Sequence, residues 1–450
     1  MSFYCTSLPY QSDAARYYAA LADLPWAVWL DSGGMARYDI LTAAPQRTLV
    51  LGEKTVRDDP FDLLRRELGE PVAPVANVPF AGGALGYWSY DLARRMMALP
   101  SVAKDAGQLP DMAVGIYDWA LVLDHRQHSA RLVSHQRFAE TAMLLPDIVA
   151  RLKNHPSLSP DTFQVRGKVR SNFTPESYAT AFKAVQNYLQ AGDCYQINLA
   201  QRFSAQADGD ALGAYLRLRS LSPAPYAAFL NFPQVRILCG SPERFISVQN
   251  GKVETRPIKG TRPRSSDAQK DRRLADELRG HPKDRAENLM IVDLLRSDLG
   301  KNCVPGSVQV PKLFEVESFA NVHHLVSTVE GRLAQGRDAL NVLRDCFPGG
   351  SVTGAPKLRA MQIIEQLEPD RRGVYCGAIG YVGFDGNMDS NIAIRTLVYS
   401  DDEIRCWAGG GIVADSDMAA EYQETLDKAS AMLELLRHYG GEYDGATQSE

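Results

Sequence analysis

Lys259 stands in the middle of a stretch suited to chemistry with anions, Thr255-Arg-Pro-Ile-Lys-Gly-Thr-Arg-Pro-Arg264. Arginines lie on both sides of it, Pro257 and Pro263 fix φ, and Gly260 lets backbone or ligand come close. Neighbouring positive charge would lower the pKa of the Lys259 amine and increase the fraction able to attack an electrophile. The stretch therefore indicates an anionic substrate or a nucleophilic amine, with a solvated basic surface loop as the alternative.

Glu287 is a carboxylate on the apolar face of a helix predicted over residues 284–298. Met290, Ile291 and Leu294 follow it at three, four and seven positions, which places them on the same face. A carboxylate in such a place is costly unless it is paired or bound to a metal. A structural salt bridge and a ligand or metal role are both compatible with this pattern.

Glu421 and Glu424 project from one face of a second predicted helix, because they are three residues apart. The glycine-rich residues 408–415 precede this helix, and we expect them to form a flexible loop whose backbone amides bind a carboxylate. Together with Glu287, the pair would supply the oxygen ligands that Mg²⁺ prefers. The alternative is a solvated acidic helix face.

Two further stretches could line a binding site. A helix predicted over residues 174–190, with Thr174 as its cap, leads into a strand on which Gln196 and Asn198 share one face. That face either lines a pocket or is exposed to solvent. Residues 347–357 place a glycine-rich turn before a helix start, where backbone amides attract anions. This turn is not a Walker A loop, because Ala355 stands where that motif requires lysine.

The composition is that of a soluble globular protein of 450 residues, with 45% hydrophobic and 23% charged residues. The net charge of −5 and the lack of a long basic block argue against nucleic acid as a partner. Seven cysteines are scattered singly, which is typical of reduced thiols and argues against a disulfide framework. No signal peptide or membrane span is evident, so we expect a cytoplasmic protein with no membrane association.

The elements that must position these residues are predicted from local patterns. Residues 26–51 alternate apolar runs with turns, a helix begins after Asp59-Pro60, and residues 118–134 are typical of a hairpin. Residues 155–172 are polar and lack an apolar period, which favours a surface crossing between two halves. We expect one large unit over 1–450, with an N-terminal region over 1–155 and a catalytic region over 172–440.

The ordered motifs together resemble those of the chorismate-utilising enzyme family over nearly the whole chain. They include Gly240-Ser-Pro-Glu-Arg-Phe245, Arg256-Pro-Ile-Lys-Gly-Thr261, residues 287–294, His323-His-Leu-Val-Ser327, residues 347–351 with 356–357, Ile394-Arg-Thr396, and Gly409-Gly-Gly-Ile-Val413 with Glu421-Tyr-Gln-Glu424. The resemblance implies an α+β fold in which two antiparallel sheets pack face to face with helices outside.

The same resemblance implies roles for individual residues. Lys259 would be the nucleophile, Glu243 the general acid and base, and His324 would lie near C4 of the substrate. Glu287 and Glu424, with Glu421 close by, would hold Mg²⁺. The expected substrate-binding residues are Gln196, Thr261, Ser351, Lys357, Tyr375, Arg395, Gly409, Gly410 and Gly411. Relatives also carry a tryptophan pocket, and Ser32, Pro225 and Tyr226 stand at the matching positions.

With lysine at position 259, the chain resembles the subfamily that aminates chorismate at C4 on the way to p-aminobenzoate and folate. In family members that make anthranilate, the corresponding motif looks like Pro-Ile-Ala-Gly-Thr, with alanine where this chain has Lys259. The resemblance implies ammonia as co-substrate and a separate glutaminase subunit as partner, since nothing in this chain resembles a glutamine amidotransferase. Gln196 stands where water-adding relatives have a lysine base. The alternatives are an anthranilate-forming large subunit and a non-catalytic relative that binds an anion as a scaffold.

Overall fold

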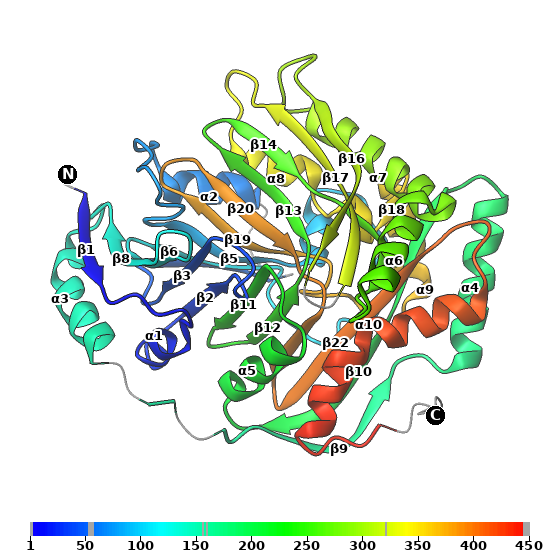
Figure 1. Cartoon of the computed structure of the whole chain (residues 1–450), viewed down its shortest axis with the longest axis horizontal. Helices are drawn as coiled ribbons and strands as arrows, with labels where there is room; N and C mark the ends of the chain where they lie inside the picture. The colour runs from blue at the N-terminus through cyan, green and yellow to red at the C-terminus, as the bar shows by residue number, and fades with distance from the viewer. Residues whose placement is uncertain (1–2, 53–57, 155–156, 159–160, 320–321, 444–450) are drawn as a thin grey trace.

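The computed structural model describes residues 3–52, 58–154, 157–158, 161–319 and 322–443. These residues form two antiparallel sheets that pack face to face, with most helices around the outside (Figure 1). The expected α+β class and two-sheet architecture are confirmed. Each sheet takes strands from both the 1–155 and the 172–440 regions, so the two regions share both sheets.

The larger sheet has the strand order β1-β8-β7-β3-β2-β11-β12-β21-β22-β10-β18, and β9 pairs with β10 beside this path. Its strands are β1 (Tyr4–Leu8), β2 (Ala27–Asp31), β3 (Tyr38–Thr42), β7 (Ala120–Asp124), β8 (Ser129–Ser134), β9 (Gln164–Ser171), β10 (Gln196–Asp208), β11 (Tyr226–Asn231), β12 (Arg236–Ser241), β18 (Gly354–Ala355), β21 (Thr396–Ser400) and β22 (Glu403–Ile412).

The second sheet has the order β15-β17-β14-β13-β20-β19-β5-β6-β4, with β16 paired to β17. Its strands are β4 (Arg47–Leu51), β5 (Gly83–Trp88), β6 (Met112–Tyr117), β13 (Arg244–Gln249), β14 (Lys252–Thr255), β15 (Ile258–Pro263), β16 (Gln309–Ser318), β17 (Val322–Arg332), β19 (Ala378–Gly383) and β20 (Met388–Ile392).

The described helices are α1 (Ala15–Ala19), α2 (Pro60–Leu68), α3 (Ala139–Lys153), α4 (Pro175–Gln190), α5 (Ala211–Leu221), α6 (Ala268–Gly280), α7 (Pro282–Gly300), α8 (Ala339–Cys346), α9 (Lys357–Leu367) and α10 (Met418–His438), with short 3₁₀ turns η1 (Tyr90–Arg95) and η2 (Gly350–Val352). None of the helices in the described part of the chain is both long and apolar enough to cross a membrane.

Alternation along the strands divides the apolar side chains of the larger sheet between its two faces. On β2, Val28 belongs to the core between the sheets, whereas Trp29 belongs to the core under the outer helices. Phe229 and Leu230 on β11 divide in the same way. Successive side chains of a strand point to opposite faces, so this sheet is buried on both sides.

Several local predictions are confirmed. Thr174 caps α4 in a reciprocal capping box, Asp59 caps α2, and β7 pairs with β8 as a hairpin. The surface crossing over 155–172 was only partly right, because β9 occupies part of it and pairs with β10. Residues 155–156 and 159–160 lie outside the described residues. β9 lies beside the main path of its sheet and is largely exposed, so it carries few of the apolar residues that mark a strand.

Candidate active site

Lys259 lies on a bulge of β15 that turns its side chain inward. The pairing of β15 with β17 shifts register between Ile258 and Thr261, and Gly260 has φ +81°. A bulge with glycine in the left-handed region bends the strand and redirects the adjacent side chain. A Cβ atom on Gly260 would also lie 2.8 Å from Cγ of Asp284. The positive φ and the close approach of Asp284 thus explain why glycine follows Lys259.

The Lys259 ammonium is held between two parts of the chain that are distant in sequence. Its Nζ lies 2.9 Å from Oε1 of Glu287 on α7 and donates to the Ser351 carbonyl at 3.2 Å. Gln196 Nε2 donates to the same Glu287 oxygen at 2.6 Å. Glu287 is therefore paired, and the Gln196 face of β10 lines this site instead of facing solvent.

The expectation that neighbouring arginines lower the pKa of Lys259 was wrong. Burial opposes the charged form of Lys259, but the carboxylates of Glu287, Glu243 and Glu424 outweigh burial and raise the pKa. Arg256 forms an ion pair with Glu317 on β16, so its charge is already neutralised. Sequence proximity was misleading here, because the charges closest to the amine come from other elements.

The other two arginines of the stretch are also paired with carboxylates. Arg262 contacts Asp284 at 3.2 Å, and Arg264 contacts Asp271 at 2.9 Å. Asp271 lies on α6 and Asp284 lies on α7, and both helices pack against β15. These arginines fasten the Lys259 strand to its covering helices.

Glu243 is a buried carboxyl group close to Lys259. It is 5% exposed, and Ser351 Oγ donates to its Oε1 at 2.9 Å. Burial raises the pKa of Glu243, although the Lys259 charge and the Ser351 hydrogen bond act in the opposite direction. A raised pKa favours the protonated form of this carboxyl group, which suits a residue that gives a proton and then takes it back.

His324 lies on β17 opposite Thr261 of β15. Thr261 Oγ1 and His324 Nδ1 are 2.9 Å apart. Burial and then the Arg395 charge lower the pKa of His324 to about 4. The imidazole is therefore neutral at physiological pH.

Gly409, Gly410 and Gly411 belong to strand β22, so the predicted flexible loop was wrong. They pair with Ala200, Leu199 and Asn198 of β10. The glycines leave room for carboxylates that converge from two helices. A Cβ atom on Gly410 would lie 2.8 Å from Glu421 Oε2 and 3.5 Å from Glu424 Oε1, and one on Gly411 would lie 3.0 Å from Glu287 Oε1.

Glu421 and Glu424 carry negative charge that basic side chains only partly neutralise. Glu421 is 3% exposed; its Oε1 accepts from Ser416 at 2.6 Å, and its buried Oε2 has no hydrogen-bond partner among the described residues. Burial raises the pKa of Glu421, and Glu424 raises it further. Lys428 Nζ lies 2.6 Å from Glu424 Oε1, and Lys283 Nζ lies 3.7 Å from Glu421 Oε1.

These carboxylates fit Mg²⁺ in the manner usual for that ion. Within the described residues, no set of three or more His, Cys, Asp and Glu side chains is placed to enclose a metal. Mg²⁺, however, is commonly held by one or two carboxylates while it keeps several waters and a substrate oxygen. The unpartnered Glu421 oxygen beside Gly410 is the donor that such an ion would satisfy.

Arg395 is a half-buried cation without an acidic partner in the described part of the chain. No carboxylate pairs with it among the residues that the structure describes, and burial lowers its pKa. Tyr375 lies close to Arg395 and is neutral, because burial raises its pKa well above the usual value. The Tyr375 ring stacks on Trp407 with centroids 6.1 Å apart. A desolvated guanidinium needs an anion, and its fork geometry matches a carboxylate.

Lys357 is already bound by two other groups of the chain. Its Nζ donates to Asp298 Oδ2 at 2.8 Å and to the Cys346 carbonyl at 2.6 Å, so a substrate carboxylate would have to compete with both. Lys428 is a residue whose role the sequence interpretation missed. Besides Glu424, it donates to the Gly409 carbonyl at 3.0 Å, which places a cation at the glycine strand. Its four-residue spacing from Glu424 was the available signal.

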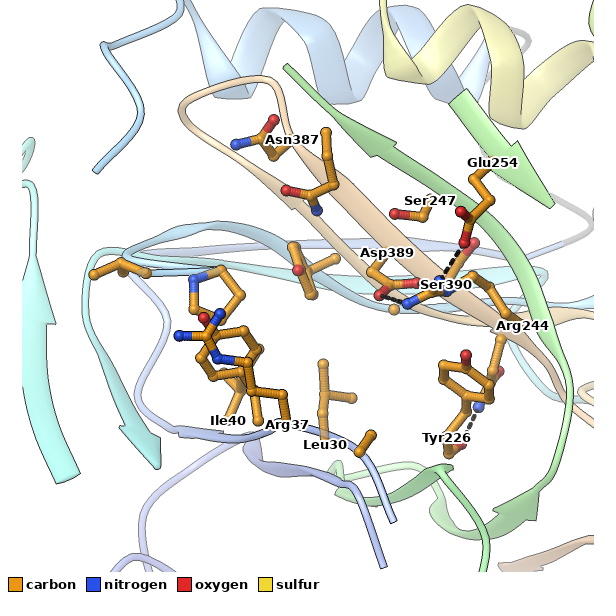
Figure 2. Close-up of a pocket in the computed structure, with 18 of the residues that line it drawn as sticks. Leu30, Arg37, Ile40, Tyr226, Arg244, Ser247, Glu254, Asn387, Asp389 and Ser390 are labelled. Carbon is orange, nitrogen blue, oxygen red and sulfur yellow. Dashed lines mark hydrogen bonds and ion pairs between the residues drawn. The ribbon is translucent and has the colours of Figure 1, made fainter. Parts of the chain in front are cut away.

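A separate pocket of about 750 Å³ lies between the two sheets (Figure 2). Two of the three residues predicted for a tryptophan pocket, Pro225 and Tyr226, line it, but Ser32 is not among the lining residues. Ser32 is 1% exposed and adjoins Asp31, which does line the pocket. Arg244 follows Glu243 on the chain, contacts Asp389 at 2.9 Å and lies 5.1 Å from the Tyr226 ring centre.

The two-sheet α+β fold thus holds a lysine enclosed by carboxylates and a half-buried arginine that has no carboxylate partner in the described part of the chain. The family model of chorismate binding enzymes matches residues 27–434. The chain belongs to this chorismate-binding enzyme family, and the resemblance noted in its motifs is confirmed.

Individual relatives are similar over most of the chain. Aminodeoxychorismate synthase component 1 of Escherichia coli is 48% identical over 96% of this chain and 98% of its own length. Anthranilate synthase component 1 of Streptomyces coelicolor is 41% identical over 90% of this chain and 82% of its own length. The crystal structure of anthranilate synthase component I from Streptococcus pneumoniae has a TM-score of 0.80 and 34% identity, covering 88% of this chain and 92% of that one.

Proposed function

We propose that this chain aminates chorismate with ammonia to give 4-amino-4-deoxychorismate through a covalent adduct on Lys259. The observation that carries the proposal is the Lys259 amine, which a strand bulge aims toward the carboxylates of Glu287 and Glu243. The 48% identity to a protein named aminodeoxychorismate synthase component 1 supports it.

The substrate is bound by charge. Arg395, beside Tyr375, receives the enolpyruvyl carboxylate, because it is a half-buried cation that has no carboxylate partner in the described part of the chain. Glu287, Glu421 and Glu424 would hold Mg²⁺, and its positive charge would attract the ring carboxylate and would lower the pKa of Lys259. Since the surrounding carboxylates raise that pKa in the protein alone, Lys259 stays an ammonium until the site is loaded.

The first half-reaction joins the lysine to the ring. The neutral Lys259 amine attacks C2 of chorismate, and both ring double bonds shift, from C1=C2 to C1=C6 and from C5=C6 to C4=C5. The C4 hydroxyl then leaves as water with a proton from Glu243. The resulting ammonium then returns a proton to the Glu243 carboxylate. Ser351 supports both groups, because its carbonyl contacts Lys259 and its hydroxyl contacts Glu243.

The second half-reaction reverses the shift with a different nucleophile. Ammonia attacks C4, the C2–N bond to Lys259 breaks, and the departing amine takes the proton from Glu243. The new C4 ammonium returns a proton to Glu243, which restores the starting state. His324 lies at the Thr261 end of the strand and is neutral, so it neither repels an ammonium at C4 nor competes with Glu243 as a strong acid.

We further infer that a glutaminase subunit supplies the ammonia. The name "component 1" of the relatives implies a second component. The free cysteines of this chain include six that are buried, which agrees with a cytoplasmic protein and leaves them unsuited to glutamine hydrolysis.

The product distinguishes the proposal from its alternatives. The purified chain is incubated with chorismate, Mg²⁺ and an ammonium salt, and the product is identified by mass spectrometry and chromatography. We expect 4-amino-4-deoxychorismate. Anthranilate would instead make the chain a relative of the anthranilate-forming large subunits. Binding of chorismate without turnover would favour a scaffold.

The pocket between the sheets is proposed to bind tryptophan. Its lining combines aromatic and aliphatic walls with charged groups on both sides, which suits an apolar ring with a zwitterionic head (Figure 2). Calorimetric titration with tryptophan should give binding that Tyr226→Ala weakens at least severalfold. Equal binding by the variant would place the amino acid elsewhere.

A further inference from the structure

Ser327 on β17 is the meeting point of three segments around the Lys259 site. Its hydroxyl donates to Asn288 Oδ1 on α7 at 2.5 Å and accepts from the Phe314 backbone amide on β16 at 3.1 Å. Its own backbone amide donates to the Pro257 carbonyl, two residues before Lys259, at 3.2 Å. Ser327 and Asn288 are both 0% exposed. A buried hydroxyl with both roles used is held in one geometry.

The α7 side of this junction flanks Glu287. Asn288 follows Glu287 directly, and Arg285 stands two residues before it with its guanidinium carbon 4.6 Å from the Phe314 ring centre. Phe314 has φ +59° at a register shift between β16 and β17. Residues on both sides of Glu287 therefore contact this junction, Asn288 through the Ser327 hydroxyl and Arg285 through the Phe314 ring.

The β15 side fixes the backbone on which Lys259 lies. Ile258 pairs with Val326 of β17, and the register then shifts at Lys259 and Gly260 before pairing resumes at Thr261. Ser327 follows Val326 and contacts Pro257, so it adjoins the start of the Lys259 bulge. One residue thus touches both elements whose side chains meet at 2.9 Å in the Lys259–Glu287 pair.

We propose that Ser327, acting through Asn288, is a positioning residue that sets the Lys259 amine against the Glu287 carboxylate. Only the predicted change in kcat rests on the proposed function, whereas the predicted placement of the two side chains does not. Asn288 Nδ2 has no partner among the described residues, so the Ser327 hydroxyl is the contact that orients this buried amide. Without the hydroxyl, Asn288 Oδ1 loses its donor and α7 is free to shift relative to β17.

The test compares two alanine variants that each remove a buried hydroxyl. In Ser327→Ala the junction to α7 and to Phe314 is lost, while the backbone pairing with Pro257 is retained. Ser134→Ala is the matched control, because Ser134 is also 0% exposed, donates to the Asp118 carbonyl and accepts from the Gln136 amide. Ser134 lies on β8, well away from β17 (Figure 1). Thermal melting of both variants shows whether they remain folded.

The first measurement is the yield of a zero-length cross-link between Lys259 and Glu287, formed by a carbodiimide in the substrate-free protein and quantified by peptide mass spectrometry. The reagent joins an amine and a carboxylate that are already in contact, so its yield reports their placement without any turnover. We expect Ser327→Ala to lower the yield severalfold and Ser134→Ala to leave it near the wild-type value. A wild-type yield in folded Ser327→Ala overturns the proposal.

The second measurement is steady-state amination of chorismate. Misplacement of reacting groups by about 1 Å lowers rates by as much as a hundredfold, so we expect Ser327→Ala to lower kcat by about tenfold or more. At saturating Mg²⁺ the KM for chorismate should stay within about twofold, because Arg395, Glu421 and Glu424 are untouched. A parallel loss in both alanine variants, or a change in KM alone, would mean that the hydroxyl serves stability only. If the wild type makes no product, the proposed function fails while the cross-link still decides the positioning role.

A surface variant guards against misfolding of Ser327→Ala. Arg285 is exposed, so Arg285→Gln removes the contact with the Phe314 ring without opening the interior. We expect a smaller decrease in the same two readouts, about twofold to threefold, as befits an exposed cation–π contact. If both readouts are unchanged in Arg285→Gln and the Ser327→Ala protein is unfolded, the proposed positioning of α7 by the Ser327 junction is refuted.

Discussion

Replacing Lys259 with alanine removes the cation at the centre of three carboxylates. The Lys259 and Glu287 side chains are 12% and 18% exposed, so their charges are poorly solvated. Breaking one partner out of a buried pair costs about 3–5 kcal/mol of unfolding free energy. We expect about 3 kcal/mol, near the lower end, because Gln196 still donates to Glu287. The cost should be larger at pH 8 than at pH 5, since protonation of a carboxylate relieves the unpaired charge.

A double variant separates this electrostatic cost from lost packing. Lys259→Ala combined with Glu287→Gln removes both charges, so it should recover about 1–2 kcal/mol relative to Lys259→Ala alone. Denaturant unfolding of the four proteins at both pH values measures the coupling. Additive effects that do not depend on pH would refute the view that the carboxylates hold Lys259 as an ammonium.

The same variant tests the chemistry. Wild-type protein incubated with chorismate and Mg²⁺, without ammonia, should accumulate a covalent adduct visible by intact mass, and peptide mapping should place it on Lys259. Lys259→Ala should form none and should lose ammonia-dependent turnover. Turnover at the wild-type rate in Lys259→Ala would remove the nucleophile role.

Three further outcomes are expected. Arg395→Gln should raise the KM for chorismate by roughly ten- to hundredfold in steady-state kinetics, because a charged hydrogen bond of about 1.5–3 kcal/mol is lost; an unchanged KM would exclude it as the carboxylate receptor. Glu424→Gln should raise the Mg²⁺ concentration for half-maximal activity by about tenfold, the effect of about 1.4 kcal/mol, and an unshifted Mg²⁺ titration would remove it from the metal site. His324→Gln should reduce the loss of stability on acidification. The pKa of His324 is lowered from 6.5 to about 4 in the folded state. Between these two pH values the folded state binds fewer protons than the unfolded state, so wild-type stability decreases as the pH is lowered. Relative to the variant, the wild type should lose about 2 kcal/mol between pH 7 and pH 5 in denaturant unfolding, and a difference independent of pH would contradict the shift.

The sequence by itself determined the local elements and the chemical types at the site. The Thr174 cap and the hairpin over 118–134 follow from nearest-neighbour patterns, and both are present. The predicted helix around Glu287 is also present, but its buried face runs through Asn288, Ile291 and Leu295, so Glu287 lies at the edge of that face. The predicted stripe also required that Glu287 be paired or metal-bound, and it is paired with Lys259. Ordered motifs were enough to identify the family.

Only the tertiary structure decided which charges act on one another. The sequence places Arg256 closest to Lys259, yet the fold gives Arg256 to Glu317 and gives Lys259 three carboxylates from other elements. Gly409–Gly411 likewise became a strand, because pairing with β10 outweighs the flexibility of glycine. Electrostatic interactions depend on distance in space and on burial, and neither quantity is encoded in the spacing of residues along a chain. The direction of the Lys259 pKa shift therefore could not be predicted before β15, α7 and α10 were placed together.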